Sequence, residues 1–573
     1  MTSPLADRPW LASYTPAVPA DVDVPDEPLT LALYRAAERF GDRVAVDFQG
    51  RATSYRALAR EVDRAAGALR ALGVRPGERV AIALPNCAAH VVAFWAVLRL
   101  GAIVVEHNPT YSADELADQL TDSGAVVAIC WQHTAARVAE VLPRTGVHTL
   151  VAVDLAADLP RAKRLGLRLP LRRARTLREQ LQGPVPAGAL DWHRLVRRAR
   201  PLDPRHPQPS TDATALLQYT GGTTGTPKAA ILTHRNLVAN AVQAVAWAGL
   251  REGAETVYGI LPFFHAFGLT LCVPIAARIG ATMLAFPKFD AADVLAAQQR
   301  RPATFLPGVA PMFDRIANLA IERGTDLGSI RVAFAGAMPI SAQTAARWEG
   351  CTGGLLIEGY GMTETSPLAL GNPCSCDRRP GTLGLPFPST AIRVVDPDDP
   401  ARDVALGERG ELLIRGPQVF AGYWGRPEDT RAALLPGGWL RTGDVVVADE
   451  AGSITLVDRT KEMIITGGFK VYPSQVENHL RAMPGVADVA VVGLPWGERG
   501  ERVVAAIVLA AQDAAAGVVD LAAVRTWCEQ RVARYAIPAE LVILAELPRS
   551  PIGKVLRRTV RDGLLAAARP VRA

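Results

Sequence analysis

Cysteine and long apolar runs are scarce in this 573-residue chain, and each shortage excludes a class of protein. The seven cysteines are odd in number and scattered, unlike the dense, even sets of secreted disulfide frameworks, so we expect a reducing, cytoplasmic location. Cys374 and Cys376 form a lone C-x-C, which favours incidental thiols over a metal site. No signal peptide is visible at the start, and the most apolar stretch, 87–105, contains His90 and Arg99. It reads better as a buried helix running into a strand than as a membrane span.

Charge is nearly balanced overall but unevenly distributed. Hydrophobic residues make up 49% and charged residues 21%, which excludes a disordered, collagen-like or coiled-coil chain. The net charge of +6 does not argue for a nucleic-acid partner. Residues 160–200, however, contain twelve basic and two acidic side chains, with leucines interleaved and Pro170 interrupting any continuous helix. We expect this segment to dock transiently on anionic membrane, with a solvated loop as the alternative.

Short apolar runs alternate with helical segments through most of the first 410 residues. A run at 44–48, a helix capped by Ser54, a second run at 80–84 and a helix at 88–100 predict parallel βαβ units. The stretch 156–210 breaks this rhythm, because it has no stable period.

The pattern changes after residue 410. Short strands joined by glycine turns predict a small β-rich unit at 410–457. Beyond residue 458 we expect an α+β domain, with helices near 474–483 and 519–533 and strands near 488–494, 503–510 and 541–546. There is no internal repeat of the solenoid kind.

The most informative segment runs from Tyr219 to Lys228, where seven of ten residues are glycine or threonine. Glycines bring backbone N–H groups into one concavity, threonines add hydroxyl donors and Lys228 adds positive charge, a combination typical of a polyphosphate site. It is not a Walker A loop, because Pro227 precedes the lysine and Ala229 follows it. Both flanks read as strands, which predicts a loop between two strands.

Four further motifs follow this loop in order: GYGMTET at 359–365, WLRTGD at 439–444, DRTKE at 458–462 and PIGK at 551–554. With the loop, they give the chain a resemblance to the acyl-adenylating superfamily of acyl-CoA ligases, luciferases and peptide-synthetase adenylation domains. The resemblance spans roughly residues 30–560 and looks most like bacterial medium- and long-chain fatty-acid–CoA ligases. Two departures are Ala229 and Ile552, where the superfamily commonly has glycine and a hydroxyl residue.

This resemblance implies an α/β fold. A large N-terminal domain, 1–457, would contain two stacked βαβ-type subdomains, the small β-rich unit and the insert. A hinge at 458–461 would lead to a small mobile α+β C-terminal domain at 462–573. It also implies two half-reactions: a carboxylate attacks the α-phosphate of MgATP to give acyl-AMP and pyrophosphate, and the thiol of coenzyme A then displaces AMP. Positioning and electrostatics would dominate the first step, since two anions must meet.

The resemblance assigns roles to individual residues. Lys554 would bridge the carboxylate and the α-phosphate, Thr363 would contact phosphate, and Glu364 would hold Mg²⁺ together with Thr224. Adenine would stack on the tyrosine of GYGMTET, and the aspartate of WLRTGD would bind the ribose hydroxyls. The expected ATP and AMP contacts are Thr220, Gly221, Gly222, Thr223, Thr224, Gly225, Lys228, Tyr360, Asp444, Arg459 and Lys470.

The same resemblance places Lys461 at the hinge and Gly467 and Gly468 beside the tunnel for coenzyme A. The two glycines would allow the pantetheine arm to approach closely. Hinge closure would select between the site for acyl-AMP formation and the site for transfer to coenzyme A.

The segment LPFFHAFG at 261–268 indicates which kind of carboxylic acid is the substrate, because it matches the apolar acyl-pocket segment of the superfamily. His265 would lie at the pocket edge, and Gly336 and Ala337 in another wall. No acidic residue occurs at 260–280, which argues against an amino-acid substrate and for an apolar carboxylic acid. The overall resemblance favours a fatty acid. The alternatives are a coumarate-type aryl-CoA ligase, transfer to a separate acyl carrier protein, and an inactive lipid-responsive binding protein. A homodimer is left open.

Overall fold

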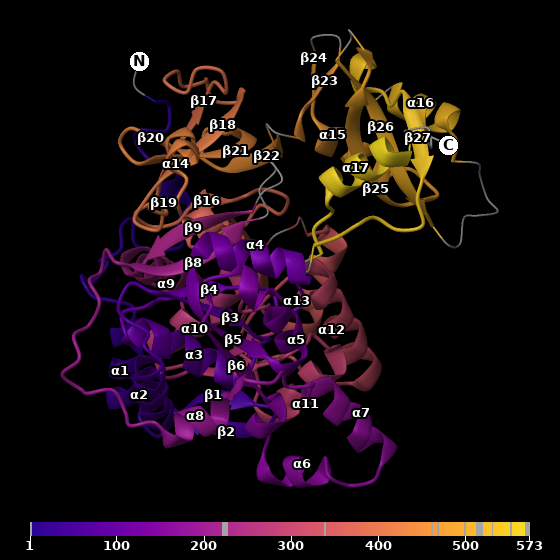
Figure 1. Cartoon of the computed structure of the whole chain (residues 1–573). Coiled ribbons are helices and arrows are strands. Elements are labelled where there is room, and N and C mark those ends of the chain that lie inside the picture. Colours follow the sequence, from indigo (N-terminus) through magenta and orange to yellow (C-terminus); the bar gives the residue numbers. More distant parts are fainter. Residues whose placement is uncertain are drawn as a thin grey trace. The chain divides into compact units, whose positions relative to one another are not determined.

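The computed structural model describes residues 3–220, 227–336, 338, 340–459, 462–466, 469–497, 500–510, 519–529, 531–550 and 553–567. The chain packs as two units (Figure 1). The large unit consists of Leu11–Ala391 and Arg415–Leu440, and the small unit of Met1–Trp10, Ile392–Ile414 and Arg441–Ala573. The expected domain boundary at 457 and the hinge at 458–461 stay predictions.

The large unit contains two mainly parallel sheets. The first, in spatial order, comprises β16 (Leu385–Pro386), β15 (Leu368–Gly371), β14 (Leu355–Gly361), β13 (Val332–Ala335), β12 (Phe305–Gly308), β10 (Thr256–Gly259), β11 (Thr282–Ala285), β1 (Val44–Phe48) and β2 (Arg51–Ser54). The second comprises β19 (Gly422–Tyr423), β9 (Lys228–Thr233), β8 (Thr214–Thr220), β4 (Ile103–Glu106), β3 (Arg79–Ala83), β5 (Ala125–Trp131), β6 (Thr149–Val153) and β7 (Leu190–Asp191). The predicted parallel βαβ units are confirmed, with antiparallel strands only toward the sheet edges.

Helices connect and cover these strands. They are α1 (Thr30–Arg39), α2 (Tyr55–Ala71), α3 (Ala88–Arg99), α4 (Ala113–Ser123), α5 (Gln132–Val141), α9 (His234–Ala248), α10 (Ala266–Ile279), α11 (Ala291–Arg300), α12 (Ala310–Arg323), α13 (Ala342–Thr352) and α14 (Pro427–Ala433). Ser54 caps α2 as expected, accepting a hydrogen bond from the Ala57 N–H at 3.3 Å. Helix α3 is buried along almost its whole length, which explains why its sequence is apolar on every face.

The basic insert is more ordered than its sequence suggested. Pro170 does separate two helices, α6 (Arg161–Gly166) and α7 (Arg172–Leu181), which lie at the lower edge of the large unit in Figure 1. The chain then returns to the sheet through β7, which pairs in parallel with β6, and continues into α8 (Trp192–Arg198). The β/α rhythm is therefore resumed inside the insert. The sequence hid this because β7 is two residues long and α8 seven.

The small unit combines a sheet with an α+β body. Its first sheet has five strands, in the order β17 (Ala391–Val395), β18 (Arg409–Arg415), β21 (Trp439–Ala448) and β20 (Leu434–Leu435), and β22 (Ile454–Arg459) also pairs with β21. The body comprises the hairpin β23 (Ile464–Thr466) and β24 (Phe469–Val471), α15 (Pro473–Arg481), β25 (Val486–Pro495), β26 (Glu501–Leu509), α16 (Leu521–Glu529), β27 (Glu540–Ile543) and α17 (Arg557–Ala567). All five elements expected beyond residue 458 are present, within a few residues of the predicted bounds.

Within the described part of the chain, no helix has the length and apolar character needed to cross a membrane. All seven cysteines are free thiols.

Candidate active site

The loop expected to bind phosphate joins two antiparallel strands, as its flanks predicted. Thr220 ends β8 and is paired with Lys228, the first residue of β9. Residues Gly221, Gly222, Thr223, Thr224 and Gly225 lie outside the described residues. The β8–β9 register therefore fixes both ends of the loop, and Lys228 enters the sheet next to the loop.

Lys228 belongs to a network that the sequence did not predict. Its ammonium group forms an ion pair with Asp429, from α14, and lies 5.6 Å from the centre of the Tyr423 ring. Tyr423 lies in β19, opposite Ala230 of β9, and its hydroxyl donates a hydrogen bond to Glu364 Oε1 at 2.7 Å. The loop lysine and the buried Glu364 are thus linked through one tyrosine.

Glu364 is held by its backbone as well as its side chain. It sits in a short 3₁₀ turn, Thr363–Thr365, and its carbonyl accepts a hydrogen bond from the Phe420 N–H at 2.9 Å. Burial and the negative charge of Glu364 raise the pKa of Tyr423, so the tyrosine hydroxyl stays protonated and donates to the carboxylate. The position of this carboxylate is therefore fixed before any ligand arrives.

Three of the predicted segments meet at Gly336. A Cβ atom added at Gly336 would lie 2.9 Å from Phe267 Cζ and 3.5 Å from the carbonyl oxygen of Gly359. These neighbours belong to the expected acyl-pocket segment and to GYGMTET, so glycine is required for the close approach. Helix α10 is also tied to the Glu364 turn, because Thr270 donates a hydrogen bond to the Ser366 carbonyl at 3.0 Å.

His265 immediately precedes α10, and burial lowers the pKa of its imidazole. A neutral imidazole at pH 7 agrees with an apolar pocket edge. Tyr360 is the penultimate residue of β14, is paired with Leu370 of β15 and is 9% exposed. Ala337, the second expected wall residue, lies outside the described residues.

In the small unit, Asp444 lies in the middle of β21 and is buried. It is paired across the sheet with Arg459 of β22, so two expected ribose and phosphate contacts lie on neighbouring strands. Glu411 of β18 supports this segment: it pairs with Arg441 through both carboxylate oxygens and accepts a hydrogen bond from the Gly443 N–H at 3.1 Å. Sequence reasoning missed Glu411, since nothing in its spacing relates it to WLRTGD.

Lys554 precedes α17 and is hydrogen-bonded back to Ser550. Its N–H donates to Ser550 Oγ at 3.1 Å, and its carbonyl accepts from the Ser550 N–H at 2.8 Å. Gly553 has a φ of 80°, a left-handed conformation that glycine adopts without strain. Arg549 also donates to the Gly553 carbonyl at 2.6 Å. The backbone of Lys554 is therefore held by its contacts to Ser550.

The structure describes little of the remaining expected site residues. Lys461, Gly467 and Gly468 lie outside the described residues, and Lys470 is described only as a backbone position in β24, paired with Ile465.

The sequence missed Tyr423 and Asp429 as well as Glu411. Both are ordinary polar residues about 200 positions from the loop in sequence. They reach Lys228 only because β19 adds antiparallel to the edge of β9, and no signal in a single sequence reports that pairing.

No cluster of three or more His, Cys, Asp or Glu side chains suited to a metal occurs among the described residues. Mg²⁺ commonly keeps several waters and takes one or two carboxylates together with substrate phosphates. A single oriented carboxylate such as Glu364, which is linked through Tyr423 to Lys228 at the end of the expected phosphate loop, fits that mode of binding.

Two mainly parallel sheets, a strand–loop–strand connection at the expected phosphate loop and a second unit carrying Asp444 and Lys554 agree with the predicted class of nucleotide-binding enzyme. Comparison with known families and proteins gives the particular family. Residues 33–424 match the AMP-binding enzyme family and residues 475–554 match the AMP-binding enzyme C-terminal domain. The chain belongs to the AMP-binding enzyme family.

Curated relatives match along nearly the whole chain. A long-chain-fatty-acid–CoA ligase of Salmonella typhimurium is 37% identical over 560 residues, 96% of this chain and 98% of that protein. A feruloyl-CoA synthase of Amycolatopsis is 35% identical over 532 residues, 92% of this chain and 97% of that protein. The crystal structure of ATP-bound MatB from Rhodopseudomonas palustris has a TM-score of 0.80 at 28% identity, covering 95% of this chain and 100% of that one. These matches confirm the predicted family, fold class, ATP-dependent acyl-CoA ligase activity and use of ATP and coenzyme A.

Proposed function

We propose that this acyl-CoA ligase acts on long-chain fatty acids, forming acyl-AMP and pyrophosphate and then acyl-CoA and AMP. The observation that carries the proposal is the convergence of Phe267, Gly336 and Gly359, which joins the apolar acyl-pocket segment to the nucleotide motif. The described segment 261–268 contains no carboxylate that could hold an ammonium group. The S. typhimurium relative favours the fatty-acid assignment.

In the first half-reaction, charge must be neutralised at the phosphates. Lys228 and the loop that precedes it would bind the polyphosphate, and Lys228 would exchange its ion pair with Asp429 for a phosphate oxygen. Glu364, oriented by Tyr423, would hold Mg²⁺ with Thr224, and the ion would neutralise phosphate charge. Thr363 would donate its hydroxyl to phosphate from the same 3₁₀ turn.

The acid would lie along the start of α10, with Gly336 and Ala337 in the wall. His265 would contact the carboxylate end as a neutral donor, consistent with the lowered pKa of its imidazole. This arrangement places the only polar group of the acid near the phosphates and leaves its chain among apolar side chains.

The small unit would supply the remaining contacts. Asp444, fixed by the Glu411–Arg441 pair, would accept hydrogen bonds from the ribose hydroxyls, and Tyr360 of the large unit would stack on adenine. Lys554 would bridge the acid and the α-phosphate, and Arg459 and Lys470 would assist at the nucleotide. Rotation at Lys461 would bring Gly467 and Gly468 to the pantetheine tunnel for the second half-reaction.

We also propose that α6 and α7 dock the enzyme on anionic membrane. The segment exposes leucines among its arginines: Leu165, Leu169, Leu171 and Leu177 are 67%, 52%, 58% and 41% exposed. Cationic side chains near an anionic surface contribute about 1 kcal/mol each, and exposed leucines add apolar contact. Arg172→Gln/Arg173→Gln should weaken co-sedimentation with phosphatidylglycerol vesicles, whereas binding that ignores lipid charge would refute docking.

The substrate proposal is tested by ATP–pyrophosphate exchange with fatty acids from C6 to C18 and with cinnamic acids, followed by addition of coenzyme A. We expect exchange that depends on added acid, is fastest with the longer fatty acids, and is followed by thioester formation. Equal turnover of cinnamic acids would favour an aryl-CoA ligase, and a requirement for acyl carrier protein would change the acceptor. Absence of exchange with every acid would favour the inactive binding protein. Sedimentation velocity would test whether the chain forms a homodimer.

A further inference from the structure

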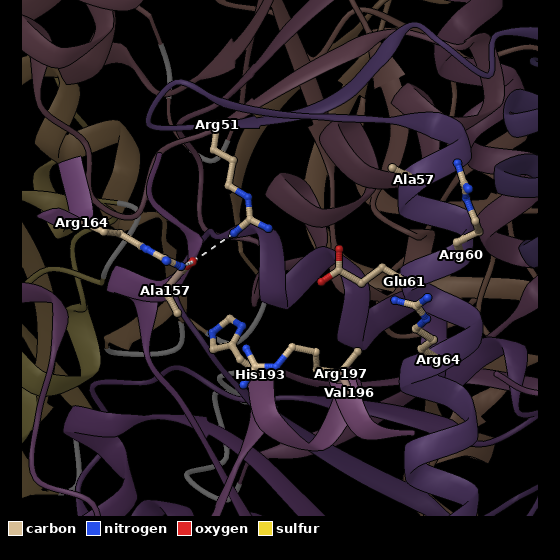
Figure 2. A pocket seen from close by; sticks show the side chains of 10 residues that line it. All are labelled: Arg51, Ala57, Arg60, Glu61, Arg64, Ala157, Arg164, His193, Val196 and Arg197. Carbon is tan, nitrogen blue, oxygen red and sulfur yellow. Dashed lines mark hydrogen bonds between the residues drawn. The ribbon is translucent and has the colours of Figure 1, made fainter. Parts of the chain in front are cut away.

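An open cavity that contains no residue of the adenylation motifs has arginine at half of its lining positions. It holds about 410 Å³ between α2, α8, the start of β2 and the insert, and its arginines are exposed (Figure 2). Ten side chains line it: Arg51, Ala57, Arg60, Glu61, Arg64, Ala157, Arg164, His193, Val196 and Arg197. Five are arginines and one is a carboxylate, so the lining has a net formal charge of +4 before His193 is counted. We call it the arginine cavity.

The arginine cavity is built by close packing of the insert on α2. A Cβ atom on Gly67 would lie only 2.0 Å from the Arg200 carbonyl oxygen, so α2 can approach the segment after α8 only because this residue is glycine. The Leu202 N–H donates to the Asp63 carbonyl at 2.8 Å, and Trp192 and Val196 of α8 are buried. The walls are therefore fixed by backbone contacts and a packed core.

Three of the five arginines, Arg60, Arg164 and Arg197, form no ion pair among the described residues, and Arg60 and Arg164 donate to the carbonyls of Arg56 and Ala157. The charges of Arg51 and Arg64 act on Glu61 and partly offset the burial that raises the pKa of its carboxyl. Arg51 also lies with its Nη1 3.6 Å from Asp158 Oδ1 and donates to the Ala157 carbonyl at 3.0 Å, as Figure 2 shows.

Five guanidinium groups against one lining carboxylate leave a net positive charge around one space, which favours binding of an anion there. Guanidinium groups bind phosphate oxygens through paired N–H donors, which lysine cannot reproduce. We propose that the arginine cavity binds a phosphate group carrying two or more negative charges. This site lies outside the proposed catalytic machinery and requires no part of it.

An adjoining cavity, also about 410 Å³, widens the site. It is lined by Arg51, Leu159, Pro160, Arg161 and Arg164, so it shares two arginines with the first. The two spaces together have room for more than one phosphate. The ligand is therefore a pyrophosphate-like or phosphomonoester group, supplied either by a free phosphorylated metabolite or by a phosphatidic acid headgroup.

Calorimetric titration with pyrophosphate tests the proposal. The protein is kept in saturating adenosine 5′-(α,β-methylene)triphosphate, so that the loop at 220–228 does not contribute. We expect Arg60→Gln/Arg64→Gln to weaken pyrophosphate binding at least about tenfold, because two charge-assisted contacts are lost. The matched control Arg172→Gln/Arg173→Gln removes the same charge from α7, outside the cavity, and should leave binding within about twofold.

A second variant, expected to strengthen binding, keeps the proposal testable if the double variant misfolds. Glu61→Gln removes the carboxylate from the cavity lining, so pyrophosphate should bind more tightly. Equal binding by wild type and Arg60→Gln/Arg64→Gln, or equal weakening by both double variants, would overturn the proposal. Because each comparison is between variants, it holds whether or not the nucleotide analogue occupies the loop.

Vesicles separate the two sources of phosphate. Vesicles containing phosphatidic acid are compared with phosphatidylglycerol vesicles of equal charge. If Arg60→Gln/Arg64→Gln loses binding only to the phosphatidic acid vesicles, the ligand is a lipid headgroup. If it loses only pyrophosphate binding, the ligand is a free metabolite. If neither probe depends on the two arginines, the cavity is not a phosphate site.

Discussion

The hydrogen bond from Tyr423 to Glu364 allows a sharp test of how the proposed magnesium ligand, Glu364, is held. Tyr423→Phe removes one hydroxyl and leaves the ring beside Lys228 in place. Loss of a hydrogen bond to a charged group costs about 1.5–3 kcal/mol, and loss of such an outer contact lowers metal affinity about 10–100-fold. We therefore expect the Mg²⁺ concentration that gives half-maximal acyl-AMP formation to rise at least about tenfold.

The chain offers a matched control for this change. Tyr34 donates the same kind of hydrogen bond, at 2.5 Å, to Asp63, far from the loop motif in sequence. Tyr34→Phe should lower the urea midpoint of unfolding about as much as Tyr423→Phe does, and it should leave the Mg²⁺ dependence of acyl-AMP formation unchanged. The assay is acid-dependent ATP–pyrophosphate exchange across a Mg²⁺ titration at fixed ATP. An unchanged Mg²⁺ midpoint in Tyr423→Phe, or an equal shift in both variants, would refute the reasoning.

Three further outcomes follow from the same structure. Lys554→Ala should slow acyl-AMP formation about 100-fold or more while ATP binding by calorimetry survives, and a wild-type rate would contradict its role. Gly336→Ala places a Cβ atom 2.9 Å from Phe267 Cζ, so exchange with C16 acid should fall more than exchange with C8 acid; an equal fall would remove Gly336 from the pocket wall. Glu61→Gln should raise the thermal midpoint of unfolding at pH 7.5. Burial raises the pKa of Glu61, so its negative charge destabilises the folded state at any pH above the ordinary pKa of 4.5. Below pH 4 both states are protonated and the gain should vanish, so a pH-independent gain would contradict the assignment.

The sequence predicted those parts of the site whose residues are close together in the chain, and it missed contacts between residues that are far apart in the chain. The loop, GYGMTET, WLRTGD and PIGK were found because their residues are local in sequence. The side chains that orient them were not found, because Tyr423 and Glu411 act across strand pairs that join distant segments. The periodicity that located α2 and α3 carries no information about such pairings.

The positive charge of the insert shows the same limit of sequence analysis. From the sequence alone, all of its arginines were interpreted together, as a segment that docks on anionic membrane. The fold separates it into two parts with different chemistry. The segment from 165 through α7 exposes leucines and arginines together, whereas α8 packs on α2 and, with Arg164 of α6, contributes Arg197 to the lining that includes Arg60 and Arg64. A membrane needs only a charged face, but a cavity fixed by glycine packing fits a ligand of defined size. The two parts should therefore respond separately to mutation, α7 through lipid charge in general and the arginine cavity through phosphate alone.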